Sequence, residues 1–305
     1  MKILDWLLIQ DPVIVRLSNK YLLNQKVEYH EEGLIKTYLD LYHHEEHMWG
    51  HGIYSPKWIS THYTLLELFD MDINPKNEIY IDAVHQLVKH MWFPKGRVNK
   101  YRHQDMCVVA MMLKLLAYTD INHPAIDEMI DYILMHQFLD GGWNCMWESK
   151  KPQQSSLHTT LSVIEAFHVV MTQGYARRNL ISKINEGVDV ILRKKFFRKE
   201  SDGSIIHEHM ASHHYPPRWK YDYFRALEYL ATIHYPYTNI MDESLDFIRH
   251  ELKKGYLSPG YKYPGKIHFV LERKKSAFNT LRALKILKAY DASYYEEIMK
   301  KDFEY

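Results

Sequence analysis

Apolar residues recur along most of the chain at spacings of three and four residues, which is the period of a helix with one buried face. The apolar–polar alternation that marks β-strands is scarce between the turn signals. Asp11-Pro12 and His123-Pro124 predict helix starts, because proline is tolerated in the first helical turn. The pattern predicts an all-α chain with helices at 12–24, 31–43, 58–70, 78–92, 104–119, 124–138, 157–173, 179–197, 219–233, 240–253 and 277–290.

Five of these helices begin alike, each after a loop that contains glycine. Their starts lie roughly 40 to 65 residues apart, a period typical of helical-hairpin repeats. One hairpin cannot bury both of its faces, so neighbouring hairpins must stack. We therefore expect a single domain over residues 1–305, with the helices of residues 1–45 packing on the repeats. The openings are Thr61-His62-Tyr63-Thr64, Gln104-Asp105-Met106-Cys107, Leu157-His158-Thr159-Thr160, Tyr221-Asp222-Tyr223-Phe224 and Phe278-Asn279-Thr280-Leu281.

One segment carries a motif. Residues 132–143 contain an aromatic and an aliphatic residue, then Gln137, Gly141 and Trp143, and resemble the QW motif of squalene–hopene and oxidosqualene cyclases. The glutamine can tie the helix end to the next turn, the glycine permits a tight loop and the tryptophan stacks on it. Residues 49–61, 217–222 and 278–284 are similar to short bacterial members of the same superfamily.

This resemblance implies an α/α toroid of about five to six helical hairpins, in which inner helices wall a central cavity and outer helices surround them. We place the five matched helices inside. Full-length cyclases of this superfamily use a middle aspartate of an Asp-x-Asp-Asp motif as an acid, and that motif is absent here. The nearest imitation, Asp70-Met71-Asp72, falls at a predicted helix end, so we do not expect it to be catalytic.

The composition limits the classes of partner that we expect for the protein. The formal net charge is +1, so no broad basic field suggests nucleic acid, and 46% of the residues are hydrophobic, enough for a large core. Cys107 and Cys145 are the only cysteines, which gives no disulfide framework and fits a reducing compartment. Asp5 and Asp11 interrupt the apolar N-terminal run, so we predict no signal peptide, no transmembrane segment and a cytoplasmic protein.

Polar residues occupy equivalent places in the repeats. If the ring closes, they converge at one end of the cavity and form a site for a small molecule, with Asp222 and Asp105 as acid or base and His158 as proton shuttle. The alternative is that these side chains only cap helices. The aligned column is Tyr63, Asp105, Thr159, Asp222 and Asn279, preceded by His62, Gln104, His158, Tyr221 and Phe278. The expected rim is Trp49, Trp58, Trp143, Trp147 and Trp219.

Metal binding is a weaker alternative. Protein prenyltransferase β subunits, in the same superfamily, bind zinc, and Cys145 with His158 invites the comparison, with Asp105, Asp222 or His62 as third ligand. The family's Asp-x-Cys pair is absent, and Asn144 precedes Cys145, so a buried thiol and a hydrogen-bonded imidazole are the preferred interpretation. The cluster 43–47 misses the His-Glu-x-x-His spacing, and it and the histidines of 207–214 are interpreted as solvated loops.

Three functions remain open. We narrowly prefer an enzyme that acts by acid–base chemistry on an isoprenoid or other apolar small molecule, because aromatic walls stabilise carbocations. The second is a carbohydrate-active glycosidase or lyase with Asp105 and Asp222 as paired carboxylates. The third is a non-catalytic module that binds a lipid or peptide, in which the aspartates only cap helices.

Overall fold

A computed structural model describes residues 1–99, 102–148, 150 and 152–305. The described chain is mostly helical, which confirms the all-α prediction. Its only sheet is the small antiparallel pair β1 (Arg97–Asn99) and β2 (Arg102–His103). The helices are α1 (Ile3–Leu7), α2 (Pro12–Tyr21), α3 (Gly33–Leu39), α4 (Thr61–Asp70), α5 (Glu78–Met91), α6 (Met106–Thr119), α7 (Ala125–Met135), α8 (Leu157–Thr172), α9 (Ile181–Arg193), α10 (Tyr223–Thr232), α11 (Asp242–Leu252), α12 (Ala277–Tyr290) and α13 (Ala292–Lys300).

Each predicted helix overlaps an observed one, and two observed helices were not predicted. Helix α1 has five residues, too few to show a helical period. Helix α13 has nine residues, and its short apolar stripe of Tyr294, Tyr295, Ile298 and Met299 was missed. The predicted helix at 219–233 begins only at Tyr223, because the Asp222 side chain caps its N-terminus.

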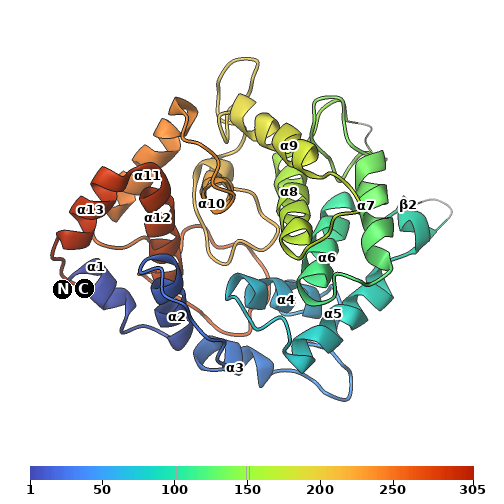
Figure 1. The fold of residues 1–305 in the computed structure, drawn as a ribbon, viewed down its shortest axis with the longest axis horizontal. Helices are drawn as coiled ribbons and strands as arrows, with labels where there is room; N and C mark the ends of the chain where they lie inside the picture. Colours follow the sequence, from blue (N-terminus) through green and yellow to red (C-terminus); the bar gives the residue numbers. More distant parts are fainter. Residues whose placement is uncertain (100–101, 149, 151) are drawn as a thin grey trace.

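The helices form two layers around the centre of the molecule (Figure 1). Helices α4, α6, α8, α10 and α12 face the centre, and each packs against the outer helix that follows it in the chain. The burial pattern agrees with this placement: α6 buries eleven of its fourteen residues, whereas the outer helix α5 buries five of fourteen. A helix that is apolar on nearly all sides needs neighbours on all sides.

The N-terminal helices lie between the last hairpin and the first (Figure 1). Helix α2 packs on α12 and on α3, and α3 packs on α4, so residues 1–45 connect the last inner helix to the first. The two ends of the chain meet there: the Met1 amino group donates to the Phe303 carbonyl at 3.0 Å, and Trp6 stacks on Tyr305. No helix in the described part of the chain is long and apolar enough to cross a membrane.

The motif at residues 132–143 has the predicted local geometry. The Gln137 amide donates to the Gly141 carbonyl at 2.9 Å, and Gly141 adopts a positive φ of 93°. The Trp143 indole donates to the Ile133 carbonyl at 2.8 Å, which fixes the buried ring against the end of α7. Trp49 repeats this contact, because its indole donates to the Tyr38 carbonyl at 2.7 Å.

A threonine hydrogen bond sets the register of three repeats. The hydroxyls of Thr61, Thr160 and Thr280 accept the backbone N–H of Trp49, Trp143 and Leu257 at 3.0, 3.1 and 2.9 Å. The sequence alignment placed Thr64 opposite Thr160 and Thr280, and all three lie four residues after their helix N-caps, Ser60, Ser156 and Ser276, so the first repeat differs only in using Thr61 as the acceptor. His62 and Tyr63 are the second and third residues of α4, and both are fully buried.

Candidate functional site

A cavity of about 330 Å³, here called the central cavity, lies among the inner helices. Its wall comes from α2, α4, α6, α8, α10 and α12 and from the segment 215–218, and its volume suits a small molecule. The lining residues are Leu17, Tyr21, Phe69, Asp70, Asp72, Lys114, Tyr118, Glu165, His168, Val169, Thr172, Gln173, Tyr215, Pro217, Arg218, Arg225, Glu228, Tyr229, Thr232, Phe278, Leu281, Arg282 and Lys285.

Two glutamates at this wall bridge neighbouring inner helices. Glu165 of α8 accepts two hydrogen bonds from Arg225 of α10, at 2.8 and 2.7 Å, and lies 3.4 Å from the Lys114 ammonium of α6. Glu228 of α10 pairs with Arg282 at 2.6 Å and Lys285 at 2.8 Å, both on α12. Arg225 and Arg282, which match in the sequence repeats, therefore each pair with a glutamate of the preceding inner helix.

These partners keep both glutamates ionised. Burial opposes the charge, but Arg225 and Lys114 hold the pKa of Glu165 below its usual range. Burial is likewise outweighed at Glu228, where Arg282 and Lys285 lower the pKa to about 2. Both carboxylates therefore remain negative across the physiological pH range.

Asp70 differs from these glutamates. It is the last residue of α4, lines the central cavity, and has no hydrogen bond or ion pair with any described residue. Burial raises its pKa from 3.8 to about 6, and the negative charge of Glu165 acts in the same direction against Lys114. The cavity wall thus holds one carboxyl with a raised pKa, Asp70, and one carboxylate with a lowered pKa, Glu165. An acid–base enzyme needs two such groups in different protonation states.

A second cavity of about 350 Å³, here called the aromatic cavity, is formed mainly by the segments that precede α4, α10 and α12. Tyr215 and Arg218 line both cavities, so the segment 215–218 separates them. Aromatic and proline side chains dominate its wall. The lining residues are Tyr38, Trp58, Glu67, His214, Tyr215, Pro216, Arg218, Pro259, Tyr261, Lys262, Tyr263, Pro264, Gly265, Ile267, His268, Phe269, Val270, Leu271 and Glu272.

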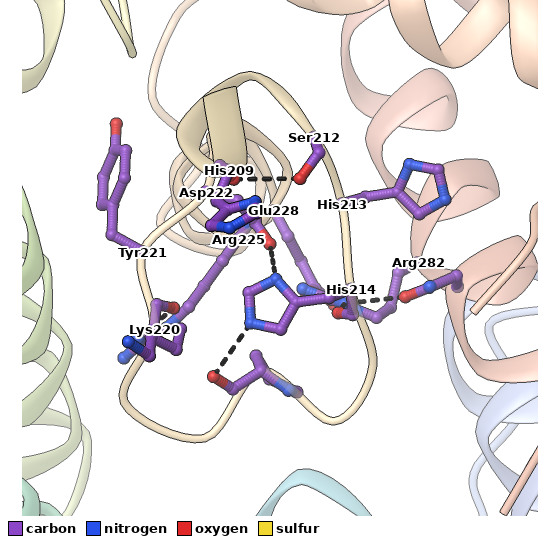
Figure 2. A network of polar contacts seen from close by, with 12 residues as sticks. His209, Ser212, His213, His214, Lys220, Tyr221, Asp222, Arg225, Glu228 and Arg282 are labelled. Carbon is purple, nitrogen blue, oxygen red and sulfur yellow. Dashed lines mark hydrogen bonds and ion pairs between the residues drawn. The ribbon is translucent and has the colours of Figure 1, made fainter. Parts of the chain in front are cut away.

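Asp222, a predicted catalytic residue, has a structural position. Its fully buried carboxylate caps α10 by accepting the Arg225 N–H at 2.7 Å, and its other oxygen contacts Nδ1 of His214 (Figure 2). Burial is outweighed by His214 and Arg282, which lower the pKa of Asp222. Nε2 of His214 lies 3.3 Å from the Pro217 carbonyl. Asp222 lines neither cavity, so its contacts fix the segment 214–217 rather than reach a bound molecule.

The other two predicted catalytic residues also lie outside both cavities. Asp105 is half-exposed, and its nearest ion partner is Arg102 at 3.5 Å. Nδ1 of His158 accepts the Tyr221 N–H at 2.8 Å, and burial lowers the His158 pKa to about 4, so the ring is neutral near pH 7. The structure therefore does not bring Asp105, His158 and Asp222 together at either cavity.

Among the predicted rim residues, Trp58 alone lines one of these two cavities. Its indole donates to the Pro264 carbonyl at 3.0 Å, and the Arg218 guanidinium lies 4.6 Å from its ring. Trp49 and Trp143 hold the repeat contacts described above. Trp147 packs on His136 with ring centres 4.0 Å apart, and Trp219 packs on His158 at 5.4 Å.

The remaining predicted binding residues are packed or bonded internally. The Tyr221 hydroxyl donates to the Phe196 carbonyl at 2.6 Å, and the Asn279 amide donates to the Ser258 carbonyl at 3.0 Å. His62 packs on Tyr63 inside α4, and burial lowers the His62 pKa to about 3. We therefore assign these side chains to the support of the helices.

Among the described residues, no group of three His, Cys, Asp or Glu side chains is arranged to hold a metal ion. The Cys145 sulfur accepts hydrogen bonds from the Cys107 backbone N–H and the Thr159 hydroxyl. In the cluster 43–47, His47 pairs with Asp82 at 2.6 Å on an exposed surface.

Comparison of the chain with models of protein families, with curated proteins and with solved structures finds no match in any of the three. The candidate site therefore rests on its own geometry. The sequence held one signal for it: Arg225 and Glu228, three residues apart on α10, face the same cavity as Arg282 and Lys285 on α12. Asp70 was set aside because it falls at a helix end, and that helix end is at the cavity wall.

Proposed function

We propose that the protein is an enzyme that acts by general acid–base chemistry on a small polar molecule of the carbohydrate class, bound in the central cavity. The observation that carries this proposal is Asp70, an unpaired carboxyl at the cavity wall with a pKa raised to about 6. Asp70 is the proton donor, and Glu165 is the fixed negative charge that faces positive charge developing on the substrate.

The chemistry of the wall favours a polar substrate. Nine charged side chains line the central cavity, and a hydrocarbon would offer them no hydrogen bonds in place of water. Hydroxyl groups can both donate to Glu228 and accept from Lys285, each of which keeps some exposed surface. Tyr118 and Phe278 add aromatic surface of the kind that packs against sugar rings. This ranking reverses the narrow preference for an apolar substrate that followed from the sequence analysis.

A second candidate function is supported by the aromatic cavity. Trp58, Tyr263 and Phe269 would suit an apolar molecule, as the resemblance to squalene cyclases implies. That occupant is tested by denaturing the purified protein and analysing the organic extract by mass spectrometry. A stoichiometric isoprenoid or fatty ligand favours this second candidate.

The test of the first candidate is a screen of chromogenic glycosides and uronate-containing oligosaccharides, with products detected by mass spectrometry. On any substrate found, Asp70→Asn should lower kcat about 10²- to 10⁴-fold while binding persists, because the amide cannot donate the proton. The matched control is Asp120→Asn, at the end of the adjacent inner helix α6 and outside the central cavity, which should keep full activity.

Two outcomes would contradict the proposal. If Asp70→Asn turns over the substrate at the wild-type rate, Asp70 is not the acid. If sugars bind to the wild-type protein but none is ever converted, and Asp70→Asn binds them equally well, the chain is a binding module.

A further inference from the structure

The two cysteines of the chain, 38 residues apart in the sequence, meet in the structure. The backbone N–H of Cys107 donates to the Cys145 sulfur at 2.9 Å, and the Cys107 thiol also hydrogen-bonds to that sulfur. Both side chains are free and partly exposed. Neither lines the central or the aromatic cavity, so this pair is independent of the function proposed above.

The surroundings of the two sulfurs are unequal. Cys145 accepts hydrogen bonds from the Cys107 thiol, from the Cys107 N–H and from the Thr159 hydroxyl at 3.3 Å. Cys107 is the second residue of the fourteen-residue helix α6, so the N–H that reaches Cys145 belongs to a helix N-terminus, where negative charge is favoured. Cys107 is the donor in this arrangement.

These contacts shift the pKa values of the two thiols in opposite directions. The hydrogen bond from Cys107 is the largest effect, and with Thr159 it lowers the pKa of Cys145 despite burial and despite the charge of Asp105. The same hydrogen bond and burial raise the pKa of Cys107. An activated thiolate beside a protonated thiol is the arrangement found in oxidisable cysteine pairs.

We propose that Cys145 is a nucleophilic thiolate and Cys107 its resolving thiol, so that peroxides oxidise the pair to a reversible intramolecular disulfide. The Cys145 sulfur attacks one peroxide oxygen, the O–O bond breaks, and the leaving hydroxide takes a proton to become water. The Cys107 sulfur then attacks the sulfur of the Cys145 sulfenic acid and loses its proton, and the displaced hydroxide leaves as a second water. Two thiols are oxidised by two electrons, and one hydrogen peroxide is reduced to two waters.

The disulfide would join the start of α6 to the segment before α8, two helices that pack on each other in the inner layer. A dithiol such as dithiothreitol returns both thiols by exchange.

The first experiment treats the wild-type protein with stoichiometric hydrogen peroxide. The expected product is lighter by about 2 Da and yields one cross-linked peptide pair, and dithiothreitol restores the original mass. A gain of oxygen atoms at one cysteine, with the other left as a free thiol, would overturn the proposal.

The second experiment measures which sulfur is the nucleophile. Limiting iodoacetamide on the folded wild-type protein should alkylate Cys145 at least about tenfold faster than Cys107, and in urea the two rates should become equal. Equal rates in the folded protein would refute the assignment.

The variants extend this test. After peroxide treatment Cys107→Ser should stop at a sulfenic acid that dimedone traps at Cys145. The matched variant Cys145→Ser should give much less dimedone adduct at Cys107. Because both measurements on the wild-type protein stand without the variants, misfolding of either variant would not leave the proposal untested.

Discussion

The two sides of the inner layer use the same repeat differently. Helices α6 and α8 pack closely on each other, and α6 is apolar on nearly all sides. Helices α10 and α12 instead carry arginines that reach glutamates of the preceding inner helix, across the central cavity wall. In the aligned repeats Val108 of α6 and Ser162 of α8 stand where α10 and α12 have Arg225 and Arg282. The same position of the repeat therefore contributes to the packed core in α6 and α8 and to the charged cavity wall in α10 and α12.

The largest expected effect comes from breaking the charged wall. Glu165→Gln leaves Arg225 and Lys114, both buried, without a counter-charge, so the free energy of unfolding should fall by about 3 to 5 kcal/mol. Urea denaturation followed by far-UV circular dichroism measures this loss.

A surface pair is the control for that measurement. Glu251, on the outer helix α11, pairs with Lys254, and the exposed fractions of the two side chains are 34% and 44%. Glu251→Gln should therefore lower the free energy of unfolding by less than about 1 kcal/mol. Equal losses for the two variants would mean that the Glu165 pair is solvated and that the contrast between the two sides is false.

The apolar side should respond to a cavity instead of a charge. Leu113→Ala removes a fully buried side chain from α6 and should lower the free energy of unfolding by about 2 to 5 kcal/mol, typically less than the charged variant. The loss should be the same at high and low salt and at every pH where the protein folds. A marked pH dependence of the difference from wild type would show that the packing of Leu113 depends on the ion pair of its neighbour Lys114 with Glu165.

The sequence predicted the helices of both sides but not the contacts between them. Helical periodicity found α6, α8, α10 and α12 alike, because apolar packing leaves a local pattern that is visible within one helix. The pairing of Glu165 with Arg225 spans 60 residues, and no local pattern reports which helices will face each other. Asp70 and the segment 214–217 acquire their roles only from the helices and loops that surround them, so the site predicted at the helix starts fell on capping and packing residues.

The pH dependence of stability tests the isolated carboxyl on this wall. Asp70 has a folded pKa of about 6, above the usual 3.8, so folding favours its protonated form. Its contribution to stability is complete below about pH 4 and is lost as the pH rises through about 6. Asp70→Asn should therefore be more stable than the wild type by roughly 3 kcal/mol near pH 8, and the difference should vanish near pH 3.

Chemical denaturation across this pH range measures the difference. Asp72→Asn is the informative comparison, because Asp72 pairs with Arg16 and Lys20 at 3.0 and 2.7 Å and its loss should destabilise the protein near pH 8. The two aspartates of the Asp70-Met71-Asp72 segment should thus shift stability in opposite directions. Destabilisation by both substitutions would show that Asp70 has a partner in solution.

The smallest expected difference concerns a hydrogen bond that the two sides share. Thr160→Val removes the hydroxyl that accepts the Trp143 N–H on the packed side, and Thr280→Val removes its equivalent for Leu257 on the charged side. Each leaves a buried N–H without a partner while keeping the shape of the side chain, so each should cost about 1 to 3 kcal/mol. Because this hydrogen bond recurs in the repeats and does not depend on the cavity, the losses of unfolding free energy in the two variants should agree within about 0.5 kcal/mol. Because the two sites are distant, the losses should add in the double variant. A much larger loss at Thr280 would mean that the charged side depends on this contact to hold α12 and its arginine in place, and that the repeat is less uniform than its hydrogen bonds indicate.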